Sequence, residues 1–326
     1  MRSTKRWLGL VVLGVVGAIT FSAMPSLAES WPQRTVRLIV PVGAASGPDI
    51  AARVFADRLA ERWKQPVVVE NRPGADGLIG TTAFVGARDD HALLFSFAAP
   101  VSVLPVVHEK LPYDPARDLV PIASATDTFV AVAATASAKI GSLKELVTLA
   151  GSQPGKLNYN AGSGALPFVF AGFVKEAGVE IANVSYREIS LAVQDLAEGR
   201  IHVMLATMAV TLPLAHAGKV RLLAVTNKNR APAAPEVPTA IEAGYPALAF
   251  EGLAGFFGPR GISTGLRDRI AADIRAVAAD PGVANRLAAV AQVARGSTPA
   301  EFAAAIEEQR AKIASIVKLI GTKPTQ

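Results

Sequence analysis

The sequence predicts an α/β protein of about two domains, on three observations. Segments typical of β-strands alternate with segments of helical length along almost the whole chain. The chain has 326 residues, about twice the length of an average domain. Hydrophobic residues make up 51% of it, which is enough to fill real cores and excludes intrinsic disorder. The alternation of strand and helix favours parallel sheets that helices cover on both faces.

The first unit of this alternation is a strand, a loop of small residues and a helix. A β-branched run at 35–40 predicts the strand, and the small residues at 43–47 predict the turn. The helix that follows would bury Val54 and Leu59. A second helix is expected at 78–87. Further strands are expected at 66–70, 92–97, 129–134, 157–160, 181–186, 202–205 and 221–226.

Two helices are predicted to begin at S/T-x-x-E patterns. Ser142 with Glu145, and Thr298 with Glu301, match a capping box, in which each side chain accepts a backbone N–H of the other residue. The apolar residues after the second box fall on one helical stripe, which predicts a surface helix docked on a core: Phe302, Ile306, Ile313, Ile316 and Val317.

The amino-terminal segment is typical of a secretory signal peptide. Three basic residues precede an uncharged apolar stretch at 8–21, and Ser26 and Ala28 are small residues at the positions that signal peptidase recognises. The alternative is a membrane anchor, which would need about 20 apolar residues. We therefore expect residues 1–28 to be removed and the mature protein to be periplasmic.

A positive net charge favours an acidic partner, and removal of this leader would reduce that charge. The whole chain has 33 basic and 27 acidic residues, a formal net charge of +6. Three of the basic residues lie in the leader, so the mature chain keeps 30 against 27, a net charge of +3. The chain also has no run of five basic residues. We therefore expect no nucleic-acid partner.

The sequence lacks the residue patterns of common catalytic and metal sites. The absence of cysteine excludes disulfides, Cys-ligated zinc and thiol catalysis. The four histidines form no H-x-x-H or H-E-x-x-H pattern. A serine nucleophile elbow around Ser163 would need glycine at position 161, where Ala161 stands. Neither glycine cluster matches a nucleotide-binding motif. We predict a protein that is not an enzyme, with no catalytic residue, metal or cofactor.

Two loops of small residues, at 43–49 and 160–165, are candidate anion sites. Each lies between a predicted strand and a predicted helix, where free backbone N–H groups and the helix dipole favour a carboxylate. Small side chains also let a ligand approach the backbone. The alternative is an ordinary turn, because Ser46 and Asp49 are spaced as a capping box that would only start the helix.

Several short strings along nearly the whole mature chain match one protein family in order. The most specific are V-V-V-E-N-R-P-G-A at 67–75 and L-P-Y-D-P at 111–115. Others stand at 31–32, 36–41, 154–159, 217–221, 223–226, 237–239 and 242–244. On these strings the chain resembles the periplasmic solute receptors of the tripartite tricarboxylate transporter system, often called Bug receptors.

The resemblance implies a two-lobed periplasmic binding protein fold of type II, with a ligand cleft between the lobes. The chain would cross between lobes twice, so that residues 29–128 and 251–326 form lobe 1 and residues 129–250 form lobe 2. The implied function is capture of a small organic acid, a carboxylate, for delivery to the membrane subunits of a transporter. Those subunits would recognise the closed lobes. We expect a monomer.

The resemblance also implies the ligand-binding residues. They follow the ends of predicted strands: Val42, Gly43, Ala44, Ala45, Ser46, Gly47, Asp49, Ser96, Phe97, Ala98, Ala161, Gly162, Ser163, Gly164, Phe168, Tyr186, Arg187, Ala206 and Thr207. Arg187 is the preferred carboxylate partner, because its planar fork allows bidentate pairing. A solvated surface charge is the alternative for this arginine.

The departures from the family pattern lie where the ligand is expected. Pro48 replaces a threonine and removes one backbone donor. Phe97, Phe168 and Ala206 stand where the family more often has hydroxyl, imidazole or carboxylate groups. We expect a more apolar cleft and a ligand with one carboxylate on an aromatic or branched apolar body. Two alternatives stay open, namely a receptor-fold protein with a signalling or ligand-independent role and, less favoured, an exported hydrolase.

Overall fold

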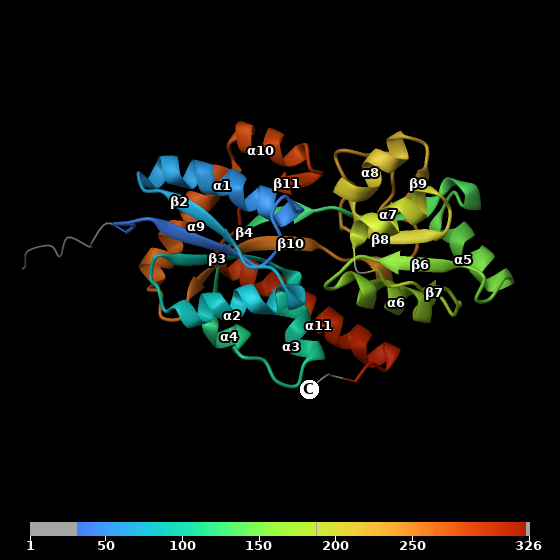
Figure 1. Cartoon of the computed structure of the whole chain (residues 1–326), viewed down its shortest axis with the longest axis horizontal. Helices are drawn as coiled ribbons and strands as arrows, with labels where there is room; N and C mark the ends of the chain where they lie inside the picture. Colours follow the sequence, from blue (N-terminus) through green and yellow to red (C-terminus); the bar gives the residue numbers. More distant parts are fainter. Residues whose placement is uncertain (1–30, 187, 324–326) are drawn as a thin grey trace, which may run out of the picture. The chain divides into compact units, whose positions relative to one another are not determined.

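The computed structural model describes residues 31–186 and 188–323, and the chain from Pro32 onward forms one compact unit (Figure 1). The predicted signal peptide, residues 1–28, lies outside the described residues. Within the described residues, no helix combines the length and the apolarity needed to span a bilayer.

The first sheet has six strands in the order β11-β4-β10-β3-β1-β2. Their bounds are β1 Val36–Val40, β2 Val67–Asn71, β3 Ala92–Phe97, β4 Leu119–Thr128, β10 Gly252–Pro259 and β11 Gln292–Ala294. Strand β1 pairs in parallel with β2 and β3, whereas β10 runs antiparallel to both β3 and β4. Strand β11 pairs antiparallel to the last residues of β4.

The second sheet has five strands in the order β7-β6-β8-β5-β9. Their bounds are β5 Val130–Thr135, β6 Asn158–Ala161, β7 Ala182–Asn183, β8 Val203–Thr207 and β9 Val220–Val225. Strand β6 is parallel to β7 and β8, and β5 is antiparallel to β8 and β9. The strand expected at 181–186 is therefore much shorter than predicted, since β7 ends at Asn183.

Both sheets are mixed, so the expectation of parallel sheets is wrong for each sheet as a whole. It is correct for pairs such as β1 and β2 or β6 and β7, where a helical crossover returns the chain in the same direction. It is wrong for β5 and β6, which α5 connects, because β5 is antiparallel and β6 is parallel to β8. Strands β4 and β5 are separated only by Phe129 and belong to different sheets. Strands β9 and β10, joined by residues 226–251, also belong to different sheets. The chain thus enters β5 and β10 from the neighbouring sheet, without a crossover that would make them parallel.

Helices cover both faces of each sheet. On the first sheet, α1 packs with α9 and α10, while α2 and α11 contribute Phe84 and Phe302 to a cluster on the other face. On the second sheet, α5 and α6 share one cluster and α7 and α8 share another. The helix bounds are α1 Gly47–Trp63, α2 Leu78–Ala87, α3 Leu104–Val107, α4 Pro115–Asp118, α5 Leu143–Ser152, α6 Leu166–Glu176, α7 Ile189–Ala197, α8 Met208–His216, α9 Thr264–Ala278, α10 Pro281–Ala288 and α11 Pro299–Ile320. Short helical turns lie at η1 Ala75–Gly77, η2 Ala99–Val103, η3 Ala136–Ala138 and η4 Pro246–Leu248.

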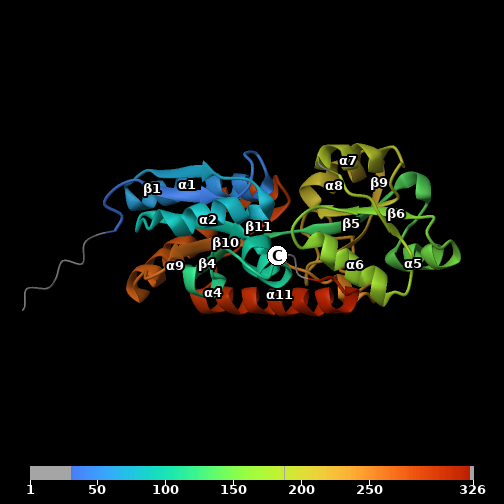
Figure 2. The ribbon, with the colours of Figure 1, turned by 60° about the horizontal axis from the view of Figure 1, so that its bottom comes forward.

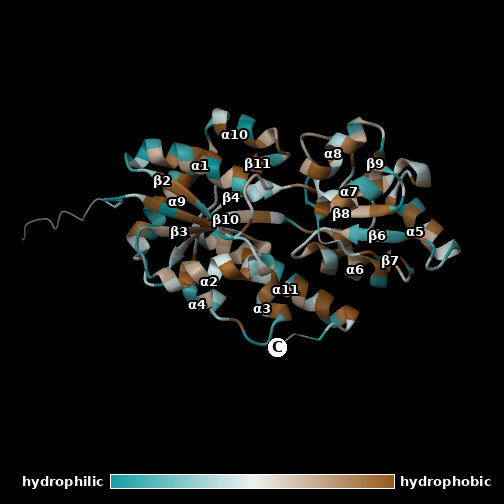
Figure 3. Cartoon of the chain, in the orientation of Figure 1, coloured by the Kyte–Doolittle hydropathy of each residue, from teal (hydrophilic) through white to brown (hydrophobic). Residues whose placement is uncertain are grey.

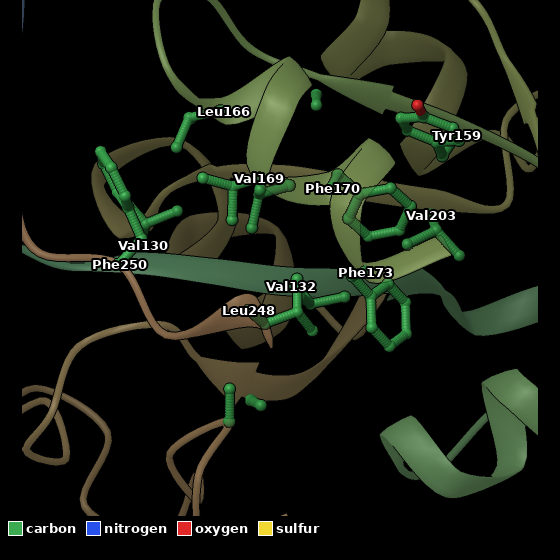
Figure 4. Packing of buried hydrophobic residues seen from close by; sticks show 14 of the residues in the cluster. Val130, Val132, Tyr159, Leu166, Val169, Phe170, Phe173, Val203, Leu248 and Phe250 are labelled. Carbon is green, nitrogen blue, oxygen red and sulfur yellow. The ribbon is translucent and has the colours of Figure 1, made fainter. Parts of the chain in front are cut away.

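The cores are built from the inward faces of these strands and helices. Figure 4 shows Phe170 and Phe173 of α6 in one cluster with Val132 of β5, and the centroid of the Phe170 ring lies 4.3 Å from that of Tyr159. Figure 3 shows apolar colours along strands such as β10, whereas α1 alternates between apolar and polar patches. This pattern confirms the α/β class, with amphipathic helices that bury one side against each sheet.

Helix α11 contributes to the cores of both sheets (Figure 2). Phe302 and Ile306, near its start, pack in the cluster of the first sheet. Ile313, Ile316 and Val317, near its end, pack in the cluster that contains α6. The predicted stripe is confirmed, and it is buried against two different partners.

The two predicted capping boxes differ in the structure. The Thr298 box is complete, because Glu301 N–H donates to Thr298 Oγ1 at 3.2 Å and Thr298 N–H donates to Glu301 Oε2 at 2.8 Å. The Ser142 box is half formed, since Glu145 N–H donates to Ser142 Oγ but the Glu145 side chain accepts from Gly141 N–H instead. The prediction of a reciprocal box is therefore correct only at α11.

Candidate functional site

The predicted ligand-binding residues lie at or after the ends of five strands, β1, β3, β6, β7 and β8. Two of these strands, β1 and β3, are linked by parallel pairing in the first sheet, and β6 and β8 are parallel neighbours in the second. Because the carboxyl ends of parallel neighbours meet at the same edge, the loops after each pair lie together. The site is thus built from two loop groups, one on each sheet.

The first loop, residues 41–46, is held by a buried carboxylate. Asp49, in the first turn of α1, is 1% exposed and accepts hydrogen bonds from Ala45 N–H and from Asn71 Nδ2, both at 2.8 Å. Arg53 Nε donates to it at 3.1 Å. Asn71 Nδ2 also donates to the carbonyl oxygen of Val42 at 3.1 Å. Asp49 therefore shapes the loop through partners inside the protein.

The electrostatics of Asp49 agree with this structural role. Burial by itself would raise the pKa of this carboxyl group. The hydrogen bonds from Arg53, Asn71 and Ala45, together with the charge of Arg53, outweigh burial, and the pKa lies below its usual value. Asp49 is thus an anion beside the loop.

The capping box considered for Ser46 and Asp49 does not form. Ser46 is the N-cap residue of α1, but its side chain accepts no backbone N–H of the helix. Its hydroxyl donates instead to the carbonyl oxygen of Gly43 at 2.8 Å. Pro48 stands in the first turn, as predicted. The alternative of an ordinary capped helix start is therefore not what forms here. Ala44 and Ala45 are exposed at the tip of the loop.

The residues after β3 connect the first loop group to the second. Ser96 is buried, and its hydroxyl reaches the carbonyl oxygen of Phe97 at 3.4 Å. A Cβ added at Gly77 would lie 3.5 Å from Phe97 Cε1, and one at Gly164 would lie 3.9 Å from Phe97 Cε2. The Phe97 ring therefore lies between a turn of the first sheet and the loop after β6. Ala98 is buried beside it.

The loop between β6 and α6 leads into a helix start where Leu166 N–H donates to the carbonyl oxygen of Ser163 at 3.4 Å and Pro167 has no N–H. Gly162 N–H donates to the carbonyl oxygen of Leu205 at 3.0 Å, which fixes the start of the loop. Helix α6 begins after Ala165 with no side-chain cap, and the first N–H groups of a helix have no partner inside it. Ser163 is exposed there, and Gly164 adopts a φ of 66°, which favours glycine.

The structure brings several predicted residues into one apolar cluster. Ala98 from the first sheet and Ala161 from the second belong to it, and the partly buried rings of Phe97 and Phe168 pack against it. The described segments 41–49, 96–99, 160–168 and 205–208 contain no lysine or arginine. A carboxylate at these segments would therefore depend on backbone N–H groups and polar side chains.

Tyr186 and Ala206 lie in a different cluster, on the α7 and α8 side of the second sheet. The Tyr186 hydroxyl donates to Asp195 Oδ2 at 2.5 Å, and Arg200 pairs with the same carboxylate. Burial, with the hydrogen bond to Asp195, raises the pKa of Tyr186 to about 12. Its hydroxyl is therefore already paired. Thr207 is the N-cap residue of α8 and makes no side-chain cap.

Arg187, the preferred carboxylate partner, lies outside the described residues. Asn160 holds the segment just before position 187. In the sequence analysis, Asn160 stood only as the first residue of the loop at 160–165. It is buried, and its Nδ2 donates to the carbonyl oxygen of Val184 at 2.9 Å. Asn71 was missed as well, because its partner Asp49 is distant in the sequence. Arg53 was missed although it stands four residues after Asp49, a spacing that places both side chains on one helix face.

Two sizeable pockets lie away from the predicted residues. One, of about 580 Å³, is lined by α11 and by Asp127, Lys228 and Arg295 near the two connections between the sheets. Burial raises the pKa of Asp127, although its ion pair with Arg295 opposes that shift. The other, of about 630 Å³, lies beside α2 and the loop before α9.

One acidic cluster has the composition of a metal site. Asp89, Asp90 and His91 bring potential ligand atoms within 4.8 Å of one another. Asp89 already pairs with Arg34 at 2.7 Å and with Arg37 at 3.5 Å. Because these guanidinium groups neutralise the carboxylate, the cluster is explained as an ion-pair network.

Comparison with known proteins gives consistent similarities. A family model described as the tripartite tricarboxylate transporter family receptor matches residues 51–322. Protein BugT of Bordetella pertussis is 29% identical over 318 residues, which cover 96% of this chain and 98% of BugT. An R. palustris protein solved with adipate is 27% identical with a TM-score of 0.80, covering 90% of this chain and all of that one.

A further solved structure has the same fold. MatC from Rhodopseudomonas palustris, solved with bound malate, is 25% identical with a TM-score of 0.75, and the match covers 88% of this chain and 100% of that one. Together with the two helix-covered sheets, these similarities confirm the predicted two-lobed periplasmic binding protein fold and the resemblance on which it rested.

Proposed function

The chain belongs to the tripartite tricarboxylate transporter receptor family, and from this premise we propose that it captures a small organic acid and delivers it to a membrane transporter. The family is one of periplasmic solute receptors, not of enzymes. Its solved relatives include one protein with adipate and one with malate, both of which are dicarboxylates. A carboxylate is therefore the ligand class that the comparisons favour.

The observation that carries this proposal is the pair of helix starts beside loops of small residues. Helices α1 and α6 each begin after such a loop, without a side-chain cap that would occupy their first N–H groups. Pro48 and Pro167 remove one N–H from each helix start, and Leu166 N–H already has a partner. The remaining N–H groups and the positive end of each helix dipole suit a carboxylate. The absence of lysine and arginine from the described loop segments gives the backbone the main role.

Closure of the two lobes is the proposed means of capture. We assign residues 29–128 and 251–326 to lobe 1 and residues 129–250 to lobe 2, since the connections between the sheets fall at Phe129 and at 226–251. A ligand that contacts loops of both lobes stabilises the closed state by the difference between its affinities for the two states. The membrane subunits would then bind the closed monomer in the periplasm.

Phe97 and Phe168 support a preference for apolar acids. Both rings pack against the same cluster at the loop ends and offer no hydrogen bond. A hydroxyl or ammonium group buried there would lack a side-chain partner, at a cost of about 1–3 kcal/mol. The proposed ligand therefore has a carboxylate on an aromatic or branched apolar body.

Calorimetric titration of the mature protein with adipate, malate, benzoate, citrate and glutamate tests the function. Binding of at least one of these acids, without chemical change of the acid, is the expected result. Conversion of a bound acid, followed by NMR of the solution, would favour an exported enzyme. The absence of binding to all five acids would favour a signalling or ligand-independent role.

A further inference from the structure

A buried side-chain amide lies beside the first loop. Gln292 begins β11 and is 2% exposed. A Cβ added at Gly47, the first residue of α1, would lie 2.9 Å from Gln292 Nε2. The amide therefore occupies the space that any side chain at position 47 would need. In Figure 1, β11 is drawn beside the same helix.

This amide has no hydrogen-bond partner within the described residues. Gln292 Oε1 is buried and unpaired. No side-chain hydrogen bond joins Gln292 Nε2 to another described residue either. Buried polar groups in native proteins are nearly always paired. Oε1 can be satisfied only by a donor, whereas Nε2, the atom that faces Gly47, can donate to an acceptor that the described chain does not supply.

The surroundings of Gln292 place it between the two loop groups. It pairs with Thr128, the last residue of β4, directly before the connection to the second sheet. Its neighbour Ala291 belongs to one apolar cluster with Phe129 and Met208. Met208 is the first residue of α8, next to Thr207. The amide thus lies beside the start of α1, and the residue before it packs in the same cluster as the start of α8.

We propose that Gln292 is a ligand-contacting residue whose amide donates a hydrogen bond to a carboxylate bound at the start of α1. This inference rests on the proposed function, since it assigns a further donor to the same site. Helix α1 has 17 residues, so its amino-terminal end has a developed positive dipole. Pro48 removes one backbone donor from this end, and the Gln292 amide replaces it with a side-chain donor.

Two substitutions at this position separate the donor from the volume of the side chain. Gln292→Leu keeps a similar volume and removes the donor. It is expected to weaken binding of the acid that the wild type binds most tightly, among adipate, malate and benzoate, by about 10- to 100-fold. Gln292→Glu places a carboxylate at the same position. It is expected to weaken binding further, because like charges would face each other.

Gln309→Leu is the matched control. Gln309 is a second buried glutamine, 6% exposed, whose Oε1 is also unpaired, but it lies on α11 and donates to the carbonyl oxygen of Glu251. Its replacement should lower stability and leave acid affinity within about twofold of the wild type, which is close to the usual spread for distant sites.

The outcomes distinguish this inference from the proposed function. If the wild type binds none of the acids, the proposed function fails and the inference fails with it. If the wild type binds and Gln292→Leu binds equally well, only the inference is overturned. If a Gln292 variant does not fold, the inference is tested on the wild-type protein by NMR. The side-chain amide resonances of Gln292 should shift in NMR spectra when the acid saturates the protein, and unchanged resonances would overturn the inference.

Discussion

At the scale of single residues, Asp49 shows how one buried carboxylate can fix the shape of a loop. Its carboxylate joins three segments, namely the loop tip at Ala45, the helix at Arg53 and the end of β2 at Asn71. Hydrogen bonds to a charged group are stronger than neutral ones, and here they are formed at a site with 1% exposure. Loop shape therefore depends on one ionised group.

Replacing this group gives a prediction about stability. Asp49→Asn removes the charge that Arg53 pairs with, and it should lower the free energy of unfolding by about 1–3 kcal/mol at neutral pH. Urea unfolding measures the change. Asp57→Asn is the control on the same helix, because Asp57 forms only an exposed pair with Arg286 and should shift stability by less than about 0.5 kcal/mol.

The pH dependence of the same group has a definite sign. Because the pKa of Asp49 is lower in the folded protein than its ordinary value of 3.8, the stabilisation is complete above that value. It is lost as the pH falls through the lower, folded pKa. Unfolding curves between pH 5 and about pH 2 should therefore fall more steeply for the wild type than for Asp49→Asn. Parallel curves for the two proteins would contradict this assignment.

At the scale of elements, α11 joins two cores that the chain builds from distant segments. Its later residues pack against α6, where a Cβ added at Gly172 would lie 3.0 Å from Ile316 Cγ2. This spacing is tight, so the absence of a side chain at 172 allows the close packing of the two helices. The contact links the carboxyl-terminal helix to the second sheet.

A double-mutant cycle tests this contact. Ile316→Ala should lower the free energy of unfolding by about 2–5 kcal/mol, because it removes a buried side chain. Gly172→Ala should destabilise the wild type through the clash with Ile316. In the Ile316→Ala background the same change should stabilise, since alanine favours the helix by about 1 kcal/mol over glycine and fills the space.

Leu319→Ala serves as the control for this cycle. Leu319 lies on the same helix and is 40% exposed, so its truncation should change stability by less than about 0.5 kcal/mol. An effect of Gly172→Ala that has the same sign and size in both backgrounds would show that Ile316 does not limit the approach of α6.

At the scale of the whole molecule, the candidate site draws its loops from both sheets. The loops after β1 and β3 belong to the first sheet, while those after β6 and β8 belong to the second. An acid that contacts both groups should raise the stability of the whole protein, because it binds only the folded state. At one hundred times the dissociation constant the expected gain is about 2.7 kcal/mol.

Ligand selectivity is the prediction that belongs to this scale. Because the rings of Phe97 and Phe168 offer no hydrogen bond, benzoate and other apolar acids should raise the melting temperature more than citrate or glutamate at equal concentration. Thermal unfolding across the panel measures this order. Tight binding of citrate or glutamate, with no response to aromatic acids, would reverse it.

The export prediction also concerns the whole molecule. If residues 1–28 are a signal peptide, the mature protein begins at Glu29. Amino-terminal sequencing of periplasmic material should read Glu29 first. Finding Trp7 in the mature chain would instead identify the leader as a membrane anchor.

Local patterns in the sequence determined much of the secondary structure. The helix at Leu78–Ala87 and the strand at Ala92–Phe97 have the predicted bounds, and the Thr298 capping box forms as expected. Such signals depend on residues within a few positions of one another, so they can be recognised in the sequence alone. The family strings likewise identified the two-lobed fold, which no periodicity argument alone had reached.

Only the tertiary structure decided which distant residues meet. It placed β10 antiparallel between β3 and β4, paired Tyr186 with Asp195, and set Gln292 against Gly47. These contacts join segments from separate elements, and neither apolar periodicity nor a capping pattern carries information about them. The direction of β10 depends on the sheet from which the chain returns, and the space for Gln292 depends on the packing of β11 beside α1. The sequence therefore predicted the loops that form the candidate site, while the packing of the sheets determined which side chains lie against them.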